Sequence, residues 1–147
     1  MRRSLSKRMG FFVMGGLMSE TSPKRILVVE DDELLADNLK RRLELEHFVV
    51  ETESSGARAL SYAAEHRPDL VILDLKLPDI NGYEVCRELR KLYHPWIVPI
   101  LMLTGMDKPI DQLRGFAHGA DVYMTKPYEP AELLKTVNLL LGQTTLA

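Results

Sequence analysis

The stretch Asp69-Leu-Val-Ile-Leu-Asp74-Leu-Lys-Leu-Pro78-Asp-Ile-Asn-Gly82-Tyr-Glu-Val85 decides the fold of this 147-residue chain. Its first part is a short apolar run, typical of a strand buried on both faces, and it ends on the carboxylate of Asp74. A proline, an Asn-Gly pair and a helical pattern follow, so the chain turns sharply there. In open α/β sheets, ligands bind at the carboxyl ends of strands. A charge at that place is costly unless a metal, a lysine or hydrogen bonds stabilise it, so the surroundings of Asp74 matter most.

The same strand-then-helix pattern occurs five times along the chain. Strands are predicted for residues 24–29, 48–52, 69–73, 99–103 and 122–124. Helices are predicted for residues 34–46, 56–66, 83–92, 109–118 (closed by Gly119) and 130–141. Regular alternation predicts a parallel sheet with helices on both faces, because each right-handed crossover needs room for a helix.

Two of these helices are predicted from the spacing of their apolar residues. In the first helix, the apolar residues that recur at helical spacing are Leu34, Leu35, Leu39, Leu43 and Leu45. The inward face expected of the second consists of Ala57, Leu60, Ala63 and Ala64.

Composition places the chain among ordinary globular domains, with 46% hydrophobic and 27% charged residues. The single cysteine, Cys86, excludes an internal disulfide and fits a reducing, cytoplasmic location. Its helical context favours a half-buried structural side chain over a reactive thiol. The histidines at 47, 66, 94 and 118 form no paired-ligand pattern, which argues against a zinc site.

The charge is unevenly distributed. The whole chain carries −2, but residues 1–18 contain four basic and no acidic residues, which leaves −6 on the remainder. An acidic body argues against direct binding of nucleic acid. The N-terminal segment superficially resembles a signal peptide, yet its apolar part is short, interrupted by glycine and lacks a cleavage site, and it cannot span a membrane. We expect either a start at Met18 or a flexible basic extension over residues 1–23.

Polar side chains follow four of the predicted strands. Glu30 and Asp31 end the first, Asp74 the third and Thr104 the fourth, and Lys126 follows the fifth. Because the carboxyl ends of parallel strands share one edge, these side chains can meet in space. Several acids favour a hard divalent cation such as Mg²⁺, and the lysine and hydroxyl are then left to hold an anion. The anion expected beside such a group is a phosphoryl group.

Four motifs in this order resemble the receiver domain of two-component response regulators. They are Ile26-Leu-Val-Val-Glu-Asp-Asp32, Leu70 to Gly82, Pro99-Ile-Leu-Met-Leu-Thr-Gly105 and Gly119-Ala-Asp-Val-Tyr-Met-Thr-Lys-Pro127. The resemblance runs from about residue 24 to 141. It implies a flavodoxin-like α/β fold whose five parallel strands are ordered 2-1-3-4-5 between five helices, with a receiver domain at 24–141 and a tail at 142–147.

The resemblance also implies roles for individual residues. Asp74 would accept a phosphoryl group from a sensor histidine kinase, a phosphotransfer protein or a small donor. Asp31, Asp74 and the backbone carbonyl of Lys76 would bind Mg²⁺ directly, and Glu30 would do so through a water. The domain would support its own phosphorylation and dephosphorylation without being an enzyme in the ordinary sense. Such chemistry depends on positioning and charge neutralisation.

Thr104, Lys126 and Tyr123 complete the implied switch. Thr104 would donate its hydroxyl to the phosphoryl group, Lys126 would pair with its charge, and Tyr123 would turn inward into the space that Thr104 vacates. The Lys126-Pro127 bond matches a family position that is cis. The output partner would bind the face formed by the fourth helix, fifth strand and fifth helix. An edge-strand aromatic without a switching role is the alternative for Tyr123.

Some positions depart from the family pattern or allow two interpretations. Lys76 places a cation beside Asp74, which leaves the phosphate lifetime open. Val122 follows Asp121, and Thr136 occupies a position that is basic in one dimerising subfamily, so that homodimer is not assumed. Asp32 is either a third acid of the pocket or, as we favour, a charge at a helix N-terminus.

Two other functional classes were compared with this one. Phosphohydrolases that resemble the haloacid dehalogenase group carry Asp-x-Asp, whereas residue 76 is lysine here. A phosphate-independent interaction module of the same fold generally lacks one of the acids, the acceptor or the lysine, all of which this chain retains. The residues after Leu141 leave no room for an output domain, so we expect a stand-alone receiver or an excised one.

Overall fold

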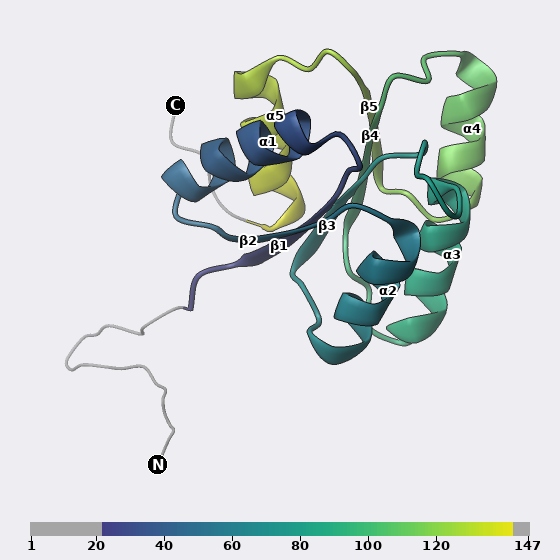
Figure 1. Cartoon of the computed structure of the whole chain (residues 1–147), viewed down its shortest axis with the longest axis horizontal. Coiled ribbons are helices and arrows are strands. Elements are labelled where there is room, and N and C mark those ends of the chain that lie inside the picture. Colours follow the sequence, from purple (N-terminus) through teal and green to yellow (C-terminus); the bar gives the residue numbers. More distant parts are fainter. Residues whose placement is uncertain (1–21, 143–147) are drawn as a thin grey trace.

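The computed structural model describes residues 22–142, which form a parallel sheet between two layers of helices (Figure 1). The strands are β1 (Arg25–Val29), β2 (Val49–Glu53), β3 (Leu70–Leu73), β4 (Ile100–Thr104) and β5 (Val122–Thr125). The helices are α1 (Glu33–Leu45), α2 (Gly56–Glu65), α3 (Gly82–Leu92), α4 (Pro109–Ala117) and α5 (Pro130–Leu140). The order β2-β1-β3-β4-β5 confirms the predicted topology. Most of the predicted N-terminal extension and C-terminal tail lies outside the described residues.

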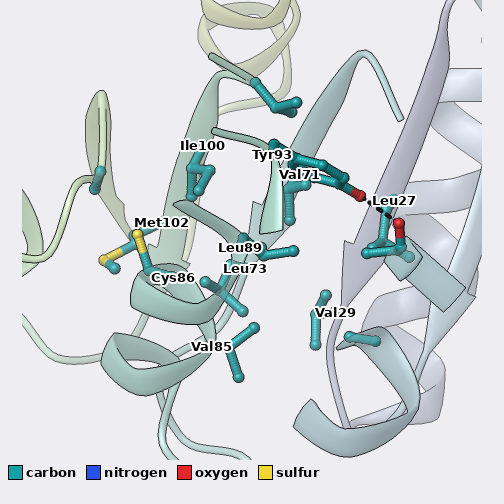
Figure 2. Close-up of a cluster of buried hydrophobic side chains, with 14 of the residues drawn as sticks. Leu27, Val29, Val71, Leu73, Val85, Cys86, Leu89, Tyr93, Ile100 and Met102 are labelled. Atoms are coloured by element: carbon teal, nitrogen blue, oxygen red, sulfur yellow. Dashed lines mark hydrogen bonds between the residues drawn. The ribbon is translucent and has the colours of Figure 1, made fainter. Parts of the chain in front are cut away.

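Each face of the sheet has its own hydrophobic core. Helices α1 and α5 cover one face, and α2, α3 and α4 cover the other (Figure 1). Figure 2 shows the second core, where Val85, Cys86 and Leu89 of α3 pack against β1, β3 and β4. Because β3 is buried on both faces, its sequence is a continuous apolar run without alternation.

The predicted inward face of α2 was partly wrong, and in α1 fewer of the helically spaced leucines are buried than exposed. In α1 only Ala36, Leu39 and Leu43 are buried, whereas Leu34, Leu35 and Leu45 are exposed. In α2 Ala63 is buried and Leu60 packs against the core, as predicted, whereas Ala57 and Ala64 face solvent and Gly56 and Ala59 are buried instead. Leucines lie on several sides of α1 and alanines on several sides of α2, so more than one buried stripe is possible and packing neighbours decide which one forms.

Other predictions were confirmed with small shifts. Helix and strand ends agree with the expected ends to within one residue, and Gly119 adopts a φ of +111° after α4, as expected of a left-handed stop. The Lys126-Pro127 bond is cis. Cys86 is fully buried rather than half-buried, and burial raises the pKa of its thiol to about 11, which makes it unreactive.

A network of polar contacts joins the elements at the amino end of the sheet. Arg90 of α3 donates to the carbonyls of Gly119 and Val98 and to the carboxylate of Asp121. Asp121 also accepts from the backbone N–H of Ile100 at 2.8 Å, which ties the start of β4 to the loop before β5. These contacts fix α3 to the two strands beneath it.

Aromatic side chains lie at the same end. Tyr93, at the end of α3, donates its hydroxyl to the carbonyl of Ala63 in α2 at 2.8 Å (Figure 2). Trp96 is 64% exposed, and the Arg67 guanidinium lies 5.5 Å from the centroid of its ring.

Of the helices described, none has both the length and the apolar character needed to cross a membrane.

Candidate functional site

Three carboxylates converge at the carboxyl end of the sheet. Glu30 and Asp31 follow β1, and Asp74 follows the neighbouring β3; one oxygen from each lies within 4.8 Å of the others. Glu30 and Asp74 are buried, and Asp31 is exposed. The sequence predicted this convergence, which requires only that β1 and β3 are adjacent and parallel.

Lys126 bridges the two buried acids. Its ammonium lies 2.5 Å from Glu30 and 2.9 Å from Asp74, and the two carboxylate side chains are each only 8% exposed. Three acids and one lysine leave a net charge of −2 when all are ionised. Burial raises the pKa of Glu30, and repulsion from Asp74 adds to this effect, although hydrogen bonds from Lys126 and the Asp32 backbone oppose it.

The charge of Lys126 is stabilised by the same contacts. Burial alone would lower the pKa of its ammonium, but hydrogen bonds to Glu30 and Asp74, together with their negative charges, raise it above its ordinary value. The cluster thus has one cationic side chain for three carboxylates, and its remaining negative charge can be neutralised by a further cation. Carboxylate oxygens are the ligands that a hard divalent cation such as Mg²⁺ prefers, so the donor set fits one.

The loop between β3 and α3 turns tightly around Asp74. The Asp74 N–H donates to the carbonyl of Val29 in β1, and the Lys76 N–H donates to the Asp74 carboxylate at 3.3 Å. A Cβ on Gly82 would lie 2.4 Å from the Asp74 carbonyl oxygen, so this position requires glycine. The backbone of Lys76 is therefore held beside the Asp74 carboxylate.

Thr104 and Tyr123 both reach the loop that follows β4. Thr104 is fully buried, and its hydroxyl accepts from the Met106 N–H at 3.4 Å. The Tyr123 hydroxyl donates to the Met106 carbonyl at 2.7 Å, and its ring packs over Gly115 of α4. Burial raises the pKa of Tyr123 to about 12, so this hydroxyl stays protonated and remains a donor. Tyr123, on the edge strand β5, is thus hydrogen-bonded to the loop that follows β4.

Two helix N-termini flank the cluster and are capped differently. Asp32 caps its own helix α1 by accepting from the N–H groups of Leu34 and Leu35, which confirms its assignment to the helix rather than the pocket. Helix α2 begins after Ser55, whose hydroxyl accepts from Arg58, and it is also capped by the distant Asp79.

Sequence reasoning missed Asp79 and Met106. Asp79 stands 23 residues after Gly56, and no short-range pattern joins the two. The one available signal was that Asp79 lies in the turn Pro78-Asp-Ile-Asn-Gly82, where a short acid often accepts backbone hydrogen bonds. Met106 acts through its backbone, so its side-chain type carries no signal.

Comparison with known proteins identifies the family. The model of the response regulator receiver domain matches residues 26–138. The chain belongs to the response regulator receiver domain family. Receiver domains of solved structure share this fold: a CheY-like receiver domain protein from Methanospirillum hungatei is 33% identical with a TM-score of 0.77, covering 82% of this chain and 95% of its own.

Further relatives support the same assignment. The BeF₃-activated N-terminal receiver domain of Klebsiella pneumoniae RstA is 35% identical with a TM-score of 0.76, covering 81% of this chain and 99% of its own. The alkaline phosphatase synthesis transcriptional regulatory protein PhoP of Bacillus subtilis is 42% identical over 124 residues. That match covers 84% of this chain but 51% of PhoP, so this receiver chain spans about half the length of that regulator.

Proposed function

We propose that this receiver domain is a phosphorylation-controlled switch in which Asp74 accepts the phosphoryl group. The observation that carries the proposal is the buried Asp74 carboxylate, which lies 2.9 Å from Lys126 and beside two further acids. The cytoplasm is the proposed place of action, and the proposed donors are a sensor histidine kinase, a phosphotransfer protein or a small phosphorylated molecule. Family membership supports these donors.

The proposed reaction moves a phosphoryl group from nitrogen to oxygen. A carboxylate oxygen of Asp74 attacks the phosphorus of a phosphohistidine, an acyl phosphate bond forms, the phosphorus–nitrogen bond breaks, and its electron pair returns to the imidazole of the donor. Lys126 pairs with the charge on the transferred group, and the Thr104 hydroxyl donates to one of its oxygens. Positioning and charge neutralisation account for most of the catalysis of such transfers.

The residues that would hold Mg²⁺ are Asp31, Asp74, the backbone carbonyl of Lys76 and, through a water, Glu30. When bound, Mg²⁺ neutralises charge on the phosphoryl oxygens. The fit rests on the excess negative charge of the cluster and on its oxygen donors. Hydrolysis of the acyl phosphate by water would reset the switch, so the domain supports both its phosphorylation and its dephosphorylation.

The backbone of Met106 connects Thr104, in the site, with Tyr123 on β5. Thr104 accepts from its N–H, and Tyr123 donates to its carbonyl. A phosphoryl group that draws the Thr104 hydroxyl away would change both contacts, and therefore the start of α4. The proposed output surface is α4, β5 and α5, where Leu113 and Phe116 of α4 are exposed. The output partner is a protein, with a second copy of the chain as one candidate; we propose no direct contact with nucleic acid.

Intact mass spectrometry tests the acceptor directly. The wild type is incubated with acetyl phosphate or phosphoramidate and Mg²⁺, beside Asp74→Asn and an EDTA control. We expect one added phosphate on the wild type and none on the variant or with EDTA. If neither small donors nor a cognate kinase phosphorylate the wild type, the domain is a phosphate-independent interaction module, and Asp74→Asn would then leave partner affinity unchanged.

A further inference from the structure

The loop 75–81, between β3 and α3, carries the Lys76 carbonyl and is anchored on a neighbouring helix. Helices α2 and α3 pack side by side on one face of the sheet (Figure 1). The loop passes the N-terminus of α2 before α3 begins. A side chain in the loop can therefore reach the first backbone N–H groups of α2, which have no acceptor within their own helix.

Asp79 makes this contact with both carboxylate oxygens. Its Oδ1 accepts from the Gly56 N–H at 2.9 Å, and its Oδ2 accepts from the Ala57 N–H at 2.7 Å. These two hydrogen bonds lower the pKa of Asp79, so it is ionised at neutral pH. Ser55 already caps α2 through the Arg58 N–H. The contact from Asp79 therefore adds to a helix that has its own cap.

Ile80, the residue after Asp79, packs tightly against Gly56 at the start of α2. A Cβ on Gly56 would lie 2.4 Å from Cγ1 of Ile80 and 2.8 Å from Cγ2 of Val85, so the absence of a side chain lets the loop approach the helix. At the other end of the loop, Gly82 lies against the Asp74 carbonyl. The loop is thus held near both its middle and its end.

We infer that Asp79 is a positioning residue for the metal site: its carboxylate, bound to the first N–H groups of α2, fixes the loop that presents the Lys76 carbonyl beside Asp74. Asp79 stands three residues after Lys76, within one short turn, so releasing it frees the backbone between them. The inference rests on the proposed function, because it assumes that Mg²⁺ binds at this cluster.

Mg²⁺ affinity measured by isothermal titration calorimetry on the unphosphorylated protein tests the inference. Asp79→Ala is expected to raise the apparent dissociation constant about tenfold, as removal of groups that orient metal ligands commonly does. Ser55→Ala is the matched control, since it removes a cap from the same helix without touching the loop. It should leave Mg²⁺ affinity within about twofold of the wild type. Asp79→Asn keeps one acceptor oxygen without the charge and should recover part of the affinity.

Each other outcome overturns a specific step. Equal weakening by Asp79→Ala and Ser55→Ala would mean that the effect is only destabilisation of α2. Equal weakening by Asp79→Ala and Asp79→Asn would contradict the inference, because the accepting oxygen that asparagine keeps would then contribute nothing to holding the loop. Wild-type affinity in Asp79→Ala would end the inference while leaving the proposed function intact. A wild type that binds no Mg²⁺ would instead remove the proposed function, and the inference with it.

Discussion

The two ends of the sheet treat charged side chains in opposite ways. At the amino end, Arg90 is surrounded by acceptors: two carbonyls and the carboxylate of Asp121. At the carboxyl end, Glu30, Asp31 and Asp74 lie together, and among the described residues Lys126 is the single cation within salt-bridge distance, pairing with Glu30 and Asp74. The amino end satisfies its charges with the protein's own groups, whereas the carboxyl end keeps an excess of negative charge that a ligand can neutralise.

This contrast separates contacts that stabilise the fold from charges that a ligand can neutralise. Buried charges without sufficient partners destabilise a fold unless a bound ion compensates them. The acidic cluster as a whole therefore adds little to the stability of the unliganded protein, although removing Lys126 alone would leave two buried carboxylates without their cation. Substitutions at the two ends should separate these contributions, and the following three are ordered by their expected effect on the free energy of unfolding.

Lys126→Ala should have the largest effect on stability. It leaves Glu30 and Asp74 buried without their cation, which should lower the unfolding free energy in EDTA by about 3 kcal/mol. Urea denaturation with EDTA and with Mg²⁺ measures this, and Mg²⁺ should restore part of the loss. Lys76→Ala, which removes an exposed lysine near the same aspartate, is the control and should change stability by less than about 0.5 kcal/mol. A similar small change in Lys126→Ala would contradict the comparison.

Arg90→Ala should destabilise the other end by about 2 kcal/mol, because it leaves the carbonyls of Gly119 and Val98 without this donor and Asp121 without its cation. The rate of phosphorylation should stay within about twofold of the wild type, equivalent to about 0.4 kcal/mol. Arg87→Ala on the same helix removes only a surface pair with Glu84 and should leave stability nearly unchanged. If Arg90→Ala abolished phosphorylation in folded protein, the two ends would be coupled rather than separate.

Asp74→Asn should have the smallest effect on stability although it removes the proposed acceptor. The variant loses attraction to Lys126 but also relieves repulsion of Glu30, so in EDTA the unfolding free energy should change by less than about 1 kcal/mol. Urea denaturation beside the Lys126→Ala series measures it. A loss as large as that of Lys126→Ala would show that Asp74 is a structural partner and not an excess charge.

The charged side chains that meet at the carboxyl end of the sheet were easier to predict from the sequence than the contacts of Arg90 at the amino end. Asp74 and Glu30 were found because a carboxylate directly after a buried strand is unusual, and parallel pairing then brings such positions together. Arg90 carries no comparable signal, since a basic residue near the end of a helix is ordinarily solvated or favoured by the helix dipole. Its partners are backbone carbonyls of loops that lie 8 and 29 residues away.

The sequence distance between contacting residues also explains which helix caps and helix faces could be predicted. The local cap Asp32 was assigned correctly because its acceptor and donors are two and three residues apart. The cap at Asp79 depends on two loops that meet only after the sheet has formed. The exposure of Leu34 also follows from tertiary context, since the apolar pattern of α1 allowed more than one buried stripe.

The position of Trp96 determines what optical signal this protein offers. It is the single tryptophan of the chain, and it lies exposed beside Arg67, four residues before β4, whose far end is Thr104. The five residues of β4 alone span roughly 16 Å from the amino end of the sheet toward the end that carries the acidic cluster. Its emission will therefore not report occupancy of the acidic cluster, which must be followed by heat or by mass.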